Sequence, residues 1–213
     1  MKTYDLDWSR TRGWHHCAPP SARIALVLYF GATETLKDTA LYAQLRARFP
    51  LAQILGCSTG THVQGLSVRD DGAIGVALSF TSTRVRLAAA PIDTEEQSFA
   101  CGVQIGTQLM ADDLAAVCVL SNGLVTDGSA LIKGLSSVLP ASIPVSGGLA
   151  ADGVRFCTTL VGVNEPPGVG RVAAFALYGG SVRCSYGSAG GWDLVGPLRR
   201  AARRSTTWAS HMT

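Results

Sequence analysis

Short apolar runs alternate with amphipathic stretches along the chain, and this pattern predicts a particular order of elements. An unbroken apolar run over residues 24–30 predicts a buried strand. Apolar side chains at intervals of four predict a helix over residues 36–49, which Pro50 ends. A second apolar run predicts another buried strand over residues 52–57. A strand, helix and strand of these lengths form a βαβ unit, in which the two strands are parallel.

The same order of elements occurs again later in the chain. A strand is predicted over residues 116–120, and a helix begins after it at Thr126 or Asp127 and runs to residue 139. A further short strand follows Pro144. The second copy therefore repeats the apolar run, the polar loop, the helix and the second apolar run of the first copy.

The spacing within the two copies is also matched. From Ile24 to Gly56 is 32 positions, and from Ala115 to Gly147 is also 32. A match of this kind predicts two copies of one βαβ unit. It also places two glycine clusters at equivalent strand ends, which is where parallel sheets usually bind ligands.

Further strands are predicted after each copy by short apolar runs between turn residues. They cover residues 63–68, 73–80 and 85–91 after the first copy, and 155–163, 171–178 and 182–185 after the second. A helix is predicted between the copies, over residues 95–111. The fold class is therefore α/β, with mixed sheets built from two duplicated βαβ-plus-strand units.

The same pattern gives the expected domain boundaries. The pseudo-repeats span about residues 24–92 and 115–190, within one domain over 22–196. Residues 1–21 show no periodicity and predict an irregular N-terminal arm that docks through its tryptophans. Residues 197–213 predict an irregular basic tail.

Composition and charge exclude several classes of protein. The chain has 213 residues, of which 47% are hydrophobic and 15% charged, so it can bury a sizeable core and is not disordered. Four arginines in the acid-free tail account for the net charge of +3, and the rest of the chain has 14 basic against 15 acidic side chains. A nucleic-acid-binding domain would carry a basic face, so no nucleic-acid partner is expected.

The cysteines and the N-terminal residues bear on the compartment. Six cysteines are scattered without paired short spacing, and the first residues contain acids but no apolar run. This pattern favours reduced thiols and a cytoplasmic location. The apolar run at 24–30 is much too short to span a bilayer, so no membrane partner is expected.

The first glycine cluster could carry catalysis or bind a ligand. Gly56, Cys57, Ser58, Thr59 and Gly60 match the G-x-S-x-G motif of α/β-hydrolases. No helix is predicted after this motif. A hydrolase also needs an acidic residue and then a histidine downstream, but after His62 the only histidine is His211 in the tail. An acyl hydrolase using Ser58 or Cys57 is thus an alternative, and the main expectation is that the protein is not an enzyme.

The two glycine clusters fit a ligand-binding site better than a catalytic site. Successive backbone N–H groups near Ser58 and Thr59 can bind an anionic group. The second cluster offers a close approach of the backbone and a carboxylate, so that the two together suit a zwitterion such as an amino acid. The predicted ligand-binding residues from this second copy are Asn122, Asp127, Gly147, Gly148 and Asp152. Asp127 is also a good helix N-cap, and no set of residues has the spacing of a metal site.

Several of these motifs together resemble one known family. The segments GCSTG, DDGAIGVALSF, SNGLVTDGSALIKGL, PVSGGLAADG and GSAGGWDLVGP follow one another in the order found in the N-terminal half of a FIST domain. The resemblance covers roughly Ile24 to Pro197. The chain departs from the family in three ways. Family members continue into a C-terminal FIST region, and our hypothesis is that a frameshift or truncation precedes that region in this chain. No attached signalling domain is expected from these residues, and His62 stands where many members carry an acidic residue.

The resemblance implies an intracellular sensory domain that binds a small ligand. Amino acids are the usual suggestion for FIST domains, and the expected partners are a histidine kinase or a cyclic-di-GMP enzyme. Some members bind haem and sense nitric oxide, which makes haem an alternative cofactor for this chain. Its axial ligand would be His15, His16, His62, a cysteine or a tyrosine.

Overall fold

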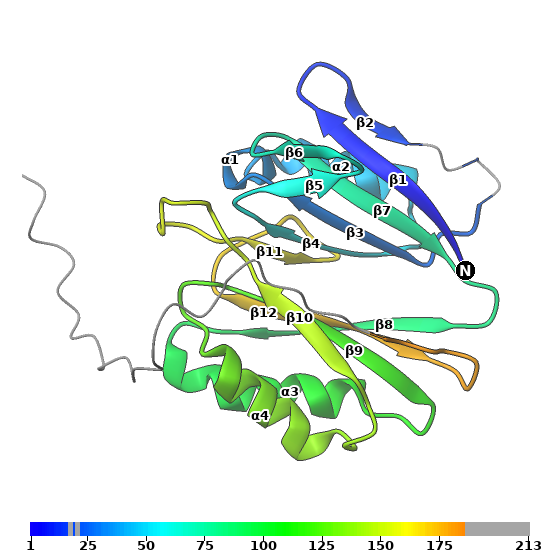
Figure 1. The fold of residues 1–213 in the computed structure, drawn as a ribbon, viewed down its shortest axis with the longest axis vertical. Coiled ribbons are helices and arrows are strands. Elements are labelled where there is room, and N and C mark those ends of the chain that lie inside the picture. The colour runs from blue at the N-terminus through cyan, green and yellow to red at the C-terminus, as the bar shows by residue number, and fades with distance from the viewer. Residues whose placement is uncertain (17–18, 20–21, 186–213) are drawn as a thin grey trace, which may run out of the picture.

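The structure, a computed structural model, describes residues 1–16, 19 and 22–185. Within them, two sheets are stacked between helices to give four layers (Figure 1). The α/β fold class expected from the sequence is confirmed. None of the helices in this part of the chain combines the length and the apolar character that crossing a bilayer requires.

The first sheet has six strands in the order β11-β4-β3-β7-β1-β2. Their bounds are Lys2–Ser9 for β1, Gly13–His16 for β2, Leu26–Gly31 for β3, Gln53–Ser58 for β4, Ala73–Ser79 for β7 and Val161–Val163 for β11. Helices α1 (Thr33–Leu36) and α2 (Thr39–Arg48) follow β3. Their leucines pack on Val27 and Tyr29 of β3 and on Leu6 and Trp8 of β1, forming one apolar core.

The second sheet has four strands in the order β10-β9-β12-β8. Their bounds are Arg84–Pro91 for β8, Leu114–Ser121 for β9, Val145–Leu149 for β10 and Arg171–Tyr178 for β12. A short 3-10 turn (Glu95–Gln97) leads into α3 (Ser98–Leu109), and α4 (Gly128–Val138) lies beside α3 below the sheet in Figure 1. Leu131 and Leu135 of α4 and Ile105 of α3 belong to the second core.

The two sheets share one pattern of strand pairing. In the first, β3 is parallel to β4 and antiparallel to β7, and β7 is antiparallel to β1. In the second, β9 is parallel to β10 and antiparallel to β12, and β12 is antiparallel to β8. This agreement supports the two βαβ-plus-strand units, while a duplication of the gene remains a prediction from the sequence.

A third apolar cluster joins the sheets where their inner faces meet. It contains Leu55 and Cys57 of β4, Leu120 of β9 and Ala173 of β12. Residues of β4 and β11 lie against β8 and β12, so the sheets are in contact along this side. Phe30 and Phe175 pack against the same cluster but stay partly exposed, so the inner faces are not fully covered by each other.

The expected irregular N-terminal arm was wrong. Residues 2–9 form β1, which pairs with β7 along its length, and β2 pairs with β1. The physical reason is an alternation with a period of two, in which Leu6 and Trp8 are buried while the side chains between them are more exposed. The tryptophans do dock this segment, because Trp14 Nε1 donates a hydrogen bond to the carbonyl of Leu41 at 2.9 Å.

Three other expected strands differ in the structure. The strand over 63–68 is a hairpin of β5 (His62–Gln64) and β6 (Ser67–Arg69), which turns at Gly65 with φ of +59°. Of the strand over 155–163, only β11 is extended, because the preceding residues fold around a carboxylate described below. Residues 182–185 form no strand.

Candidate functional site

The first glycine cluster predicted from the sequence meets the residues that follow the second cluster, at the carboxyl ends of β4 and β10. The amide of Ala151 donates to the carbonyl of Ser58 at 3.0 Å. Gly60 and Gly153 approach so closely that a Cβ on Gly60 would lie 2.8 Å from the Cα of Gly153. Glycine is required at this contact because backbone packs directly on backbone. We call this contact the glycine junction.

Ser58 and Thr59 use their polar groups within the protein. Ser58 is fully buried, its Oγ accepts a hydrogen bond from the amide of Leu160 at 2.9 Å, and its own amide donates to the carbonyl of Leu160. Thr59 donates from its amide to the carbonyl of Gly31 and from Oγ1 to the carbonyl of Thr61. These bonds tie β4 to the segment before β11, which gives the serine a structural role in this conformation.

Cys57, the other predicted nucleophile, lies in the apolar cluster between the sheets. Burial raises the pKa of its thiol to about 12. A thiol with this pKa stays protonated at neutral pH, and the thiolate is the reactive form. The arrangement therefore offers little support for nucleophilic catalysis at Cys57.

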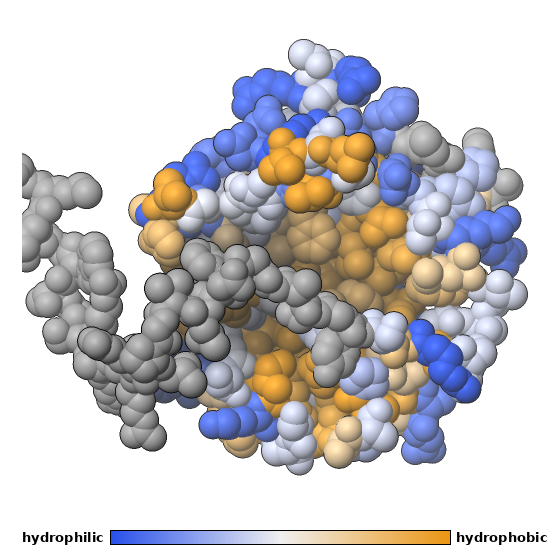
Figure 2. Space-filling view, in the orientation of Figure 1, coloured by the Kyte–Doolittle hydropathy of each residue, from blue (hydrophilic) through white to orange (hydrophobic). Residues whose placement is uncertain are grey.

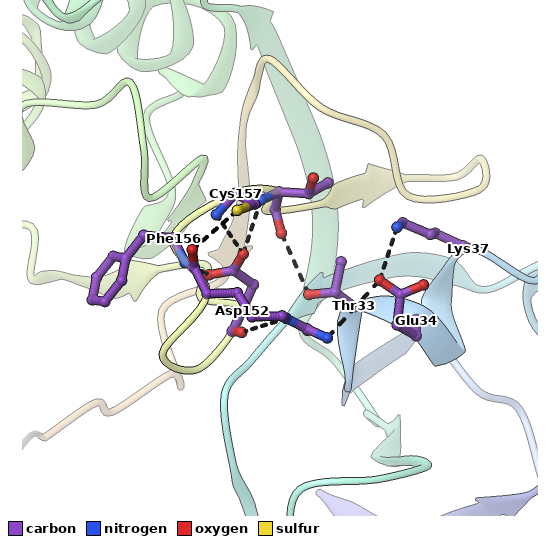
Figure 3. Close-up of polar contacts among 8 residues, drawn as sticks. Thr33, Glu34, Lys37, Asp152, Phe156 and Cys157 are labelled. Atoms are coloured by element: carbon purple, nitrogen blue, oxygen red, sulfur yellow. Dashed lines mark hydrogen bonds and ion pairs between the residues drawn. The ribbon is translucent and has the colours of Figure 1, made fainter. Parts of the chain in front are cut away.

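Asp152 organises the loop that follows β10 (Figure 3). Its carboxylate accepts hydrogen bonds from the amides of Phe156 at 3.0 Å, Cys157 at 2.7 Å and Thr158 at 2.9 Å. These bonds favour the ionised form and hold the pKa of Asp152 below its usual range, with the Thr158 and Cys157 amides as the main causes. Phe156 adopts a positive φ of 51° in this loop.

The loop also contacts the first half of the chain. Thr33 Oγ1 donates to the carbonyl of Thr158 at 3.4 Å, and the Arg155 guanidinium lies 3.9 Å from the carboxylate of Glu34. Lys37 donates to the same carboxylate at 2.8 Å. Figure 3 shows these polar contacts between the Asp152 loop and α1. The Asp152 carboxylate thus fixes a loop that spans the two halves.

Asp152→Asn is expected to lower the melting temperature, because the charge is lost and an amide nitrogen replaces one of the two acceptor oxygens, where it would face one or two N–H donors. The pKa of Asp152 is lowered by folding, so its stabilising contribution is present above the ordinary carboxyl pKa of about 4. That contribution is lost as the pH falls through the lower folded-state value. Thermal melts between pH 3 and pH 7, at values of about 3, 4, 5 and 7, test this expectation.

The matched control is Asp112→Asn, which changes an exposed aspartate. We expect the two variants to differ at pH 7 and to converge as the medium becomes more acidic. Equal melting temperatures of both variants at pH 7 would show that the three bonds to Asp152 contribute nothing to stability.

The structure does not bring all predicted residues together. Asn122 is buried beside the junction, where its Nδ2 donates to the carbonyl of Thr159 at 3.3 Å and its Oδ1 accepts from the amide of Leu124. Asp127 is instead the N-cap of α4 and accepts from the amides of Ser129 and Ala130 at 2.8 and 3.1 Å. Capping, the other interpretation of Asp127, is therefore confirmed.

Gly147 and Gly148 lie within β10 rather than in a loop. They line a groove of about 340 Å³ between β10 and α4, together with Leu131 and Leu149. The groove lies on the helix-covered side of the second sheet. The predicted ligand residues therefore divide between this groove and the glycine junction.

Sequence analysis did not predict a large cavity within the described residues. It has a volume of about 790 Å³ and lies at one end of the cleft between the sheets. Its lining includes the connection between β7 and β8, the starts of β9 and β10, and the end of β12 with the residues after it. Figure 2 shows apolar side chains lining the hollow between the two sheets.

The lining of this cavity has an apolar wall and a hydroxyl rim. Phe80, Phe175 and Leu177 supply the apolar wall, and seryl and threonyl side chains supply the rim. Arg183 is the one charged side chain among the described lining residues. The sequence does contain a feature that could have indicated this cavity. Residues of β12 alternate between the two faces of the sheet, and the odd-numbered residues face away from the helices.

The histidines do not form a metal site within the described residues. No group of three histidine, cysteine or acidic side chains is placed there to hold an ion. His62 is only 5% exposed, and neither of its ring nitrogens has a hydrogen-bond partner in the described part of the chain. Burial and the nearby Arg69 lower the pKa of His62, so the ring is neutral at pH 7. Haem binding remains an implication of the resemblance, with His62 as its buried candidate.

Comparison with known proteins agrees with the resemblance. No curated protein matches the chain. The family model of the FIST N domain matches residues 25–206, which is most of the chain and includes part of the expected basic tail. FIST domains are sensory domains rather than a known class of enzyme. Because the matched region covers both βαβ units and the cavity between the sheets, the chain belongs to the FIST N domain family.

Proposed function

We propose that this FIST domain senses a small metabolite, an amino acid or a related carboxylic acid, in the cavity between its two sheets. The observation that carries the proposal is the cavity itself. Its volume of about 790 Å³ is in the range of small-molecule sites, which is about 300–1,000 Å³. Such sites combine mostly apolar walls with a few polar groups that orient the ligand.

The lining favours a ligand with an apolar part and a carboxylate. Phe80, Phe175 and Leu177 suit an aliphatic or aromatic side chain. The Arg183 guanidinium lies at the cavity with its Nη1 bonded to the carbonyls of Gly180 and Val182, which leaves further donors for a carboxylate. The described lining holds no acidic side chain, so an ammonium group would have to bind hydroxyls and carbonyls instead.

The position of the cavity suits signalling. Its lining comes from β9, β10 and β12 of the second sheet and from the connection between β7 and β8, so a ligand inside it contacts the second sheet and the segment that joins it to the first. A ligand shifts a conformational equilibrium only through its different affinities for the two states. We propose that the ligand favours one distance between the two sheets, and that a partner protein binds preferentially to the chain in that state. A histidine kinase or a cyclic-di-GMP enzyme in the cytoplasm is the partner that the family resemblance suggests.

In this proposal the ligand-binding residues predicted from the sequence have a structural role. Ser58, Thr59, Asn122 and Asp152 hold the glycine junction through internal hydrogen bonds. Direct contact between these residues and the ligand remains a prediction. The Asp152→Asn variant described above separates the two locations, because it alters the junction and leaves the lining of the cavity unchanged.

The experiment is a set of thermal melts and calorimetric titrations with apolar amino acids and their 2-oxo acids. At least one compound should raise the melting temperature of the full chain, because only binding to the native state does so. Ser181→Trp should abolish this shift by filling the cavity, whereas Ser136→Trp on the exposed face of α4 should not. Arg183→Gln should weaken binding about tenfold, the effect of losing one charge-assisted hydrogen bond.

The results also locate the site. A shift that Asp152→Asn removes but Ser181→Trp preserves would place the ligand at the glycine junction. If no amino acid, oxo acid or haem changed the melting temperature, the proposed ligand class would be rejected. A Soret band upon addition of haem, lost in His62→Ala, would favour the gas-sensing alternative.

A further inference from the structure

The turn between β1 and β2 and the last turn of α2 enclose a second cavity, which the proposed function does not use. Residues of β2 lie against α2, and the cavity at this contact has a volume of about 330 Å³. Its lining includes Arg12, Gly13, Trp14, Gln44, Arg48 and Phe49. The volume lies within the range of about 300–1,000 Å³ that small-molecule sites have. The residues from β2 and its turn precede the segment 25–206 that the family model matches.

The walls of this cavity are held in place by contacts within the protein. Trp14 Nε1 donates to the carbonyl of Leu41 at 2.9 Å, and the indole packs edge-on against Tyr29 with 6.1 Å between the ring centroids. Gly13 has a φ of +65°, and a Cβ there would lie 2.9 Å from Oε1 of Gln44, so the turn approaches this side chain closely. A site whose walls are fixed before binding loses less conformational freedom when a ligand enters.

The charge at this cavity is positive. Arg12 and Arg48 line it, and its described lining contains no acidic side chain. The ion pair between Arg12 and Asp7 is long, at 3.8 Å, whereas Arg69 binds the other oxygen of the same carboxylate at 2.6 Å. The side chain of Arg12 is 66% exposed, and an exposed pair of this kind contributes little free energy. Arg12 can therefore turn to an anionic ligand at small cost.

The end of α2 does not cancel this positive charge. The C-terminus of a helix is negative and disfavours anions. Here Arg46 donates to three carbonyl groups of the chain just after the helix, and α2 itself contains no acidic residue. An adjoining cavity of about 570 Å³ shares Arg48 and Phe49 as lining residues and adds Arg23, again without an acidic side chain in its described lining. Positive charge thus extends along both cavities.

We propose that the cavity between the β1–β2 turn and α2 binds a small organic anion, which combines an oxyanion group with a flat apolar part. Guanidinium groups bind carboxylate and phosphoryl oxygens through paired hydrogen bonds. Arg12 on the turn and the Gln44 amide on the helix supply donors, and the rings of Trp14 and Phe49 supply an apolar wall. An aromatic carboxylate and an aromatic phosphate ester share this chemistry. The site has no lining residue in common with the 790 Å³ cavity, so it is independent of the proposed sensory ligand.

The test is an NMR titration of the full chain with phenyl phosphate, with benzoate and with the uncharged benzyl alcohol. The signal of the Trp14 indole N–H should shift in a saturable manner with at least one of the two anions, and not with benzyl alcohol. Arg12→Gln should weaken this binding about tenfold, the effect of losing one charge-assisted hydrogen bond. Gln44→Glu keeps the shape of the side chain and should abolish binding, because it places a carboxylate in the cavity.

The matched control is Arg10→Gln, which removes a charge from the same turn at a residue outside the lining. It should leave the binding unchanged. Shifts without saturation, or equal weakening in Arg10→Gln and Arg12→Gln, would show only a general attraction to exposed arginines and would overturn the proposal. The absence of a response to both anions would reject it as well. Binding of only one anion would support the site and identify a carboxylate or a phosphoryl group as the group recognised.

A further variant separates this site from the cavity of the proposed function. Ser181→Trp fills the 790 Å³ cavity, and it should leave the shifts at Trp14 unchanged. Loss of these shifts in Ser181→Trp would place the anion in that cavity and would reject the site at α2. Failure of the amino-acid titrations, in contrast, leaves the expected result at Trp14 unaltered.

Discussion

Gly134→Ala is expected to destabilise the protein by about 3 kcal/mol, the upper part of the usual range for overpacking. Gly134 lies on the face of α4 that packs on α3. A Cβ at this position would overlap the carbonyl oxygen of Phe99 and would lie 3.1 Å from the Cα of Gly102. These neighbours are backbone atoms of a helix, so they cannot move aside without shifting α3 on the sheet.

Urea unfolding followed by circular dichroism measures this loss. The matched control is Gly106→Ala on α3, where the nearest atom to a new Cβ is Cγ2 of the Val138 side chain at 3.0 Å. That side chain can adjust, and alanine has the higher helix propensity by up to about 1 kcal/mol. The control should therefore change the free energy of unfolding by less than about 1 kcal/mol. Similar losses in the two variants would show that close contact between the helices is not what stabilises this layer.

Gly147→Ala is expected to cost a similar free energy, about 3 kcal/mol, through a clash within the sheet. Gly147 has a φ of +149°, and a Cβ there would overlap the carbonyl of Val119 on the neighbouring strand β9. Relief of this overlap requires the two parallel strands to separate. Since β10 also lines the cavity through Ser146, the variant should bind the cavity ligand more weakly as well.

The adjacent residue provides the control for this substitution. Gly148→Ala places its Cβ where no other heavy atom lies within 4 Å, and Gly148 does not have a positive φ. We expect nearly unchanged stability for Gly148→Ala and a clear loss for Gly147→Ala in the same unfolding measurement. A loss in both would indicate that any side chain on β10 disturbs the sheet edge, and would contradict the specific clash with Val119.

Local patterns in the sequence predicted the elements that depend on local interactions. The buried strands at 26–31 and 114–121 and the helix that ends before Pro50 follow from apolar periodicity and from a residue that cannot continue a helix. Asp127 was predicted as a ligand residue, with a helix N-cap as the other interpretation, and its side chain caps α4 by accepting from amides two and three residues away. The N-terminal strand β1 was missed, since its short alternation becomes informative only when β7 pairs with it.

For the candidate site, too, the sequence predicted the local features but not the contacts between distant residues. The sequence placed two glycine clusters at equivalent strand ends, and the first of them contacts Ala151 and Gly153, which follow the second. It did not reveal that Ser58 would bond to a residue 102 positions away, or that Asp152 would be occupied by amides of its own loop. Polar residues that looked available for a ligand are therefore engaged in joining the halves.

The sequence by itself determined the order of strands and helices within the two βαβ units, the matched spacing of these units and membership of the FIST family. These properties rest on periodicity and motifs within short stretches of chain, which are visible without knowledge of distant contacts. The tertiary structure decided which strand edge is covered, where the cavity lies and which polar groups remain available. Those properties depend on contacts between residues far apart in sequence, such as Phe80 and Phe175 at the cavity, and only packing of the complete sheets brings them together.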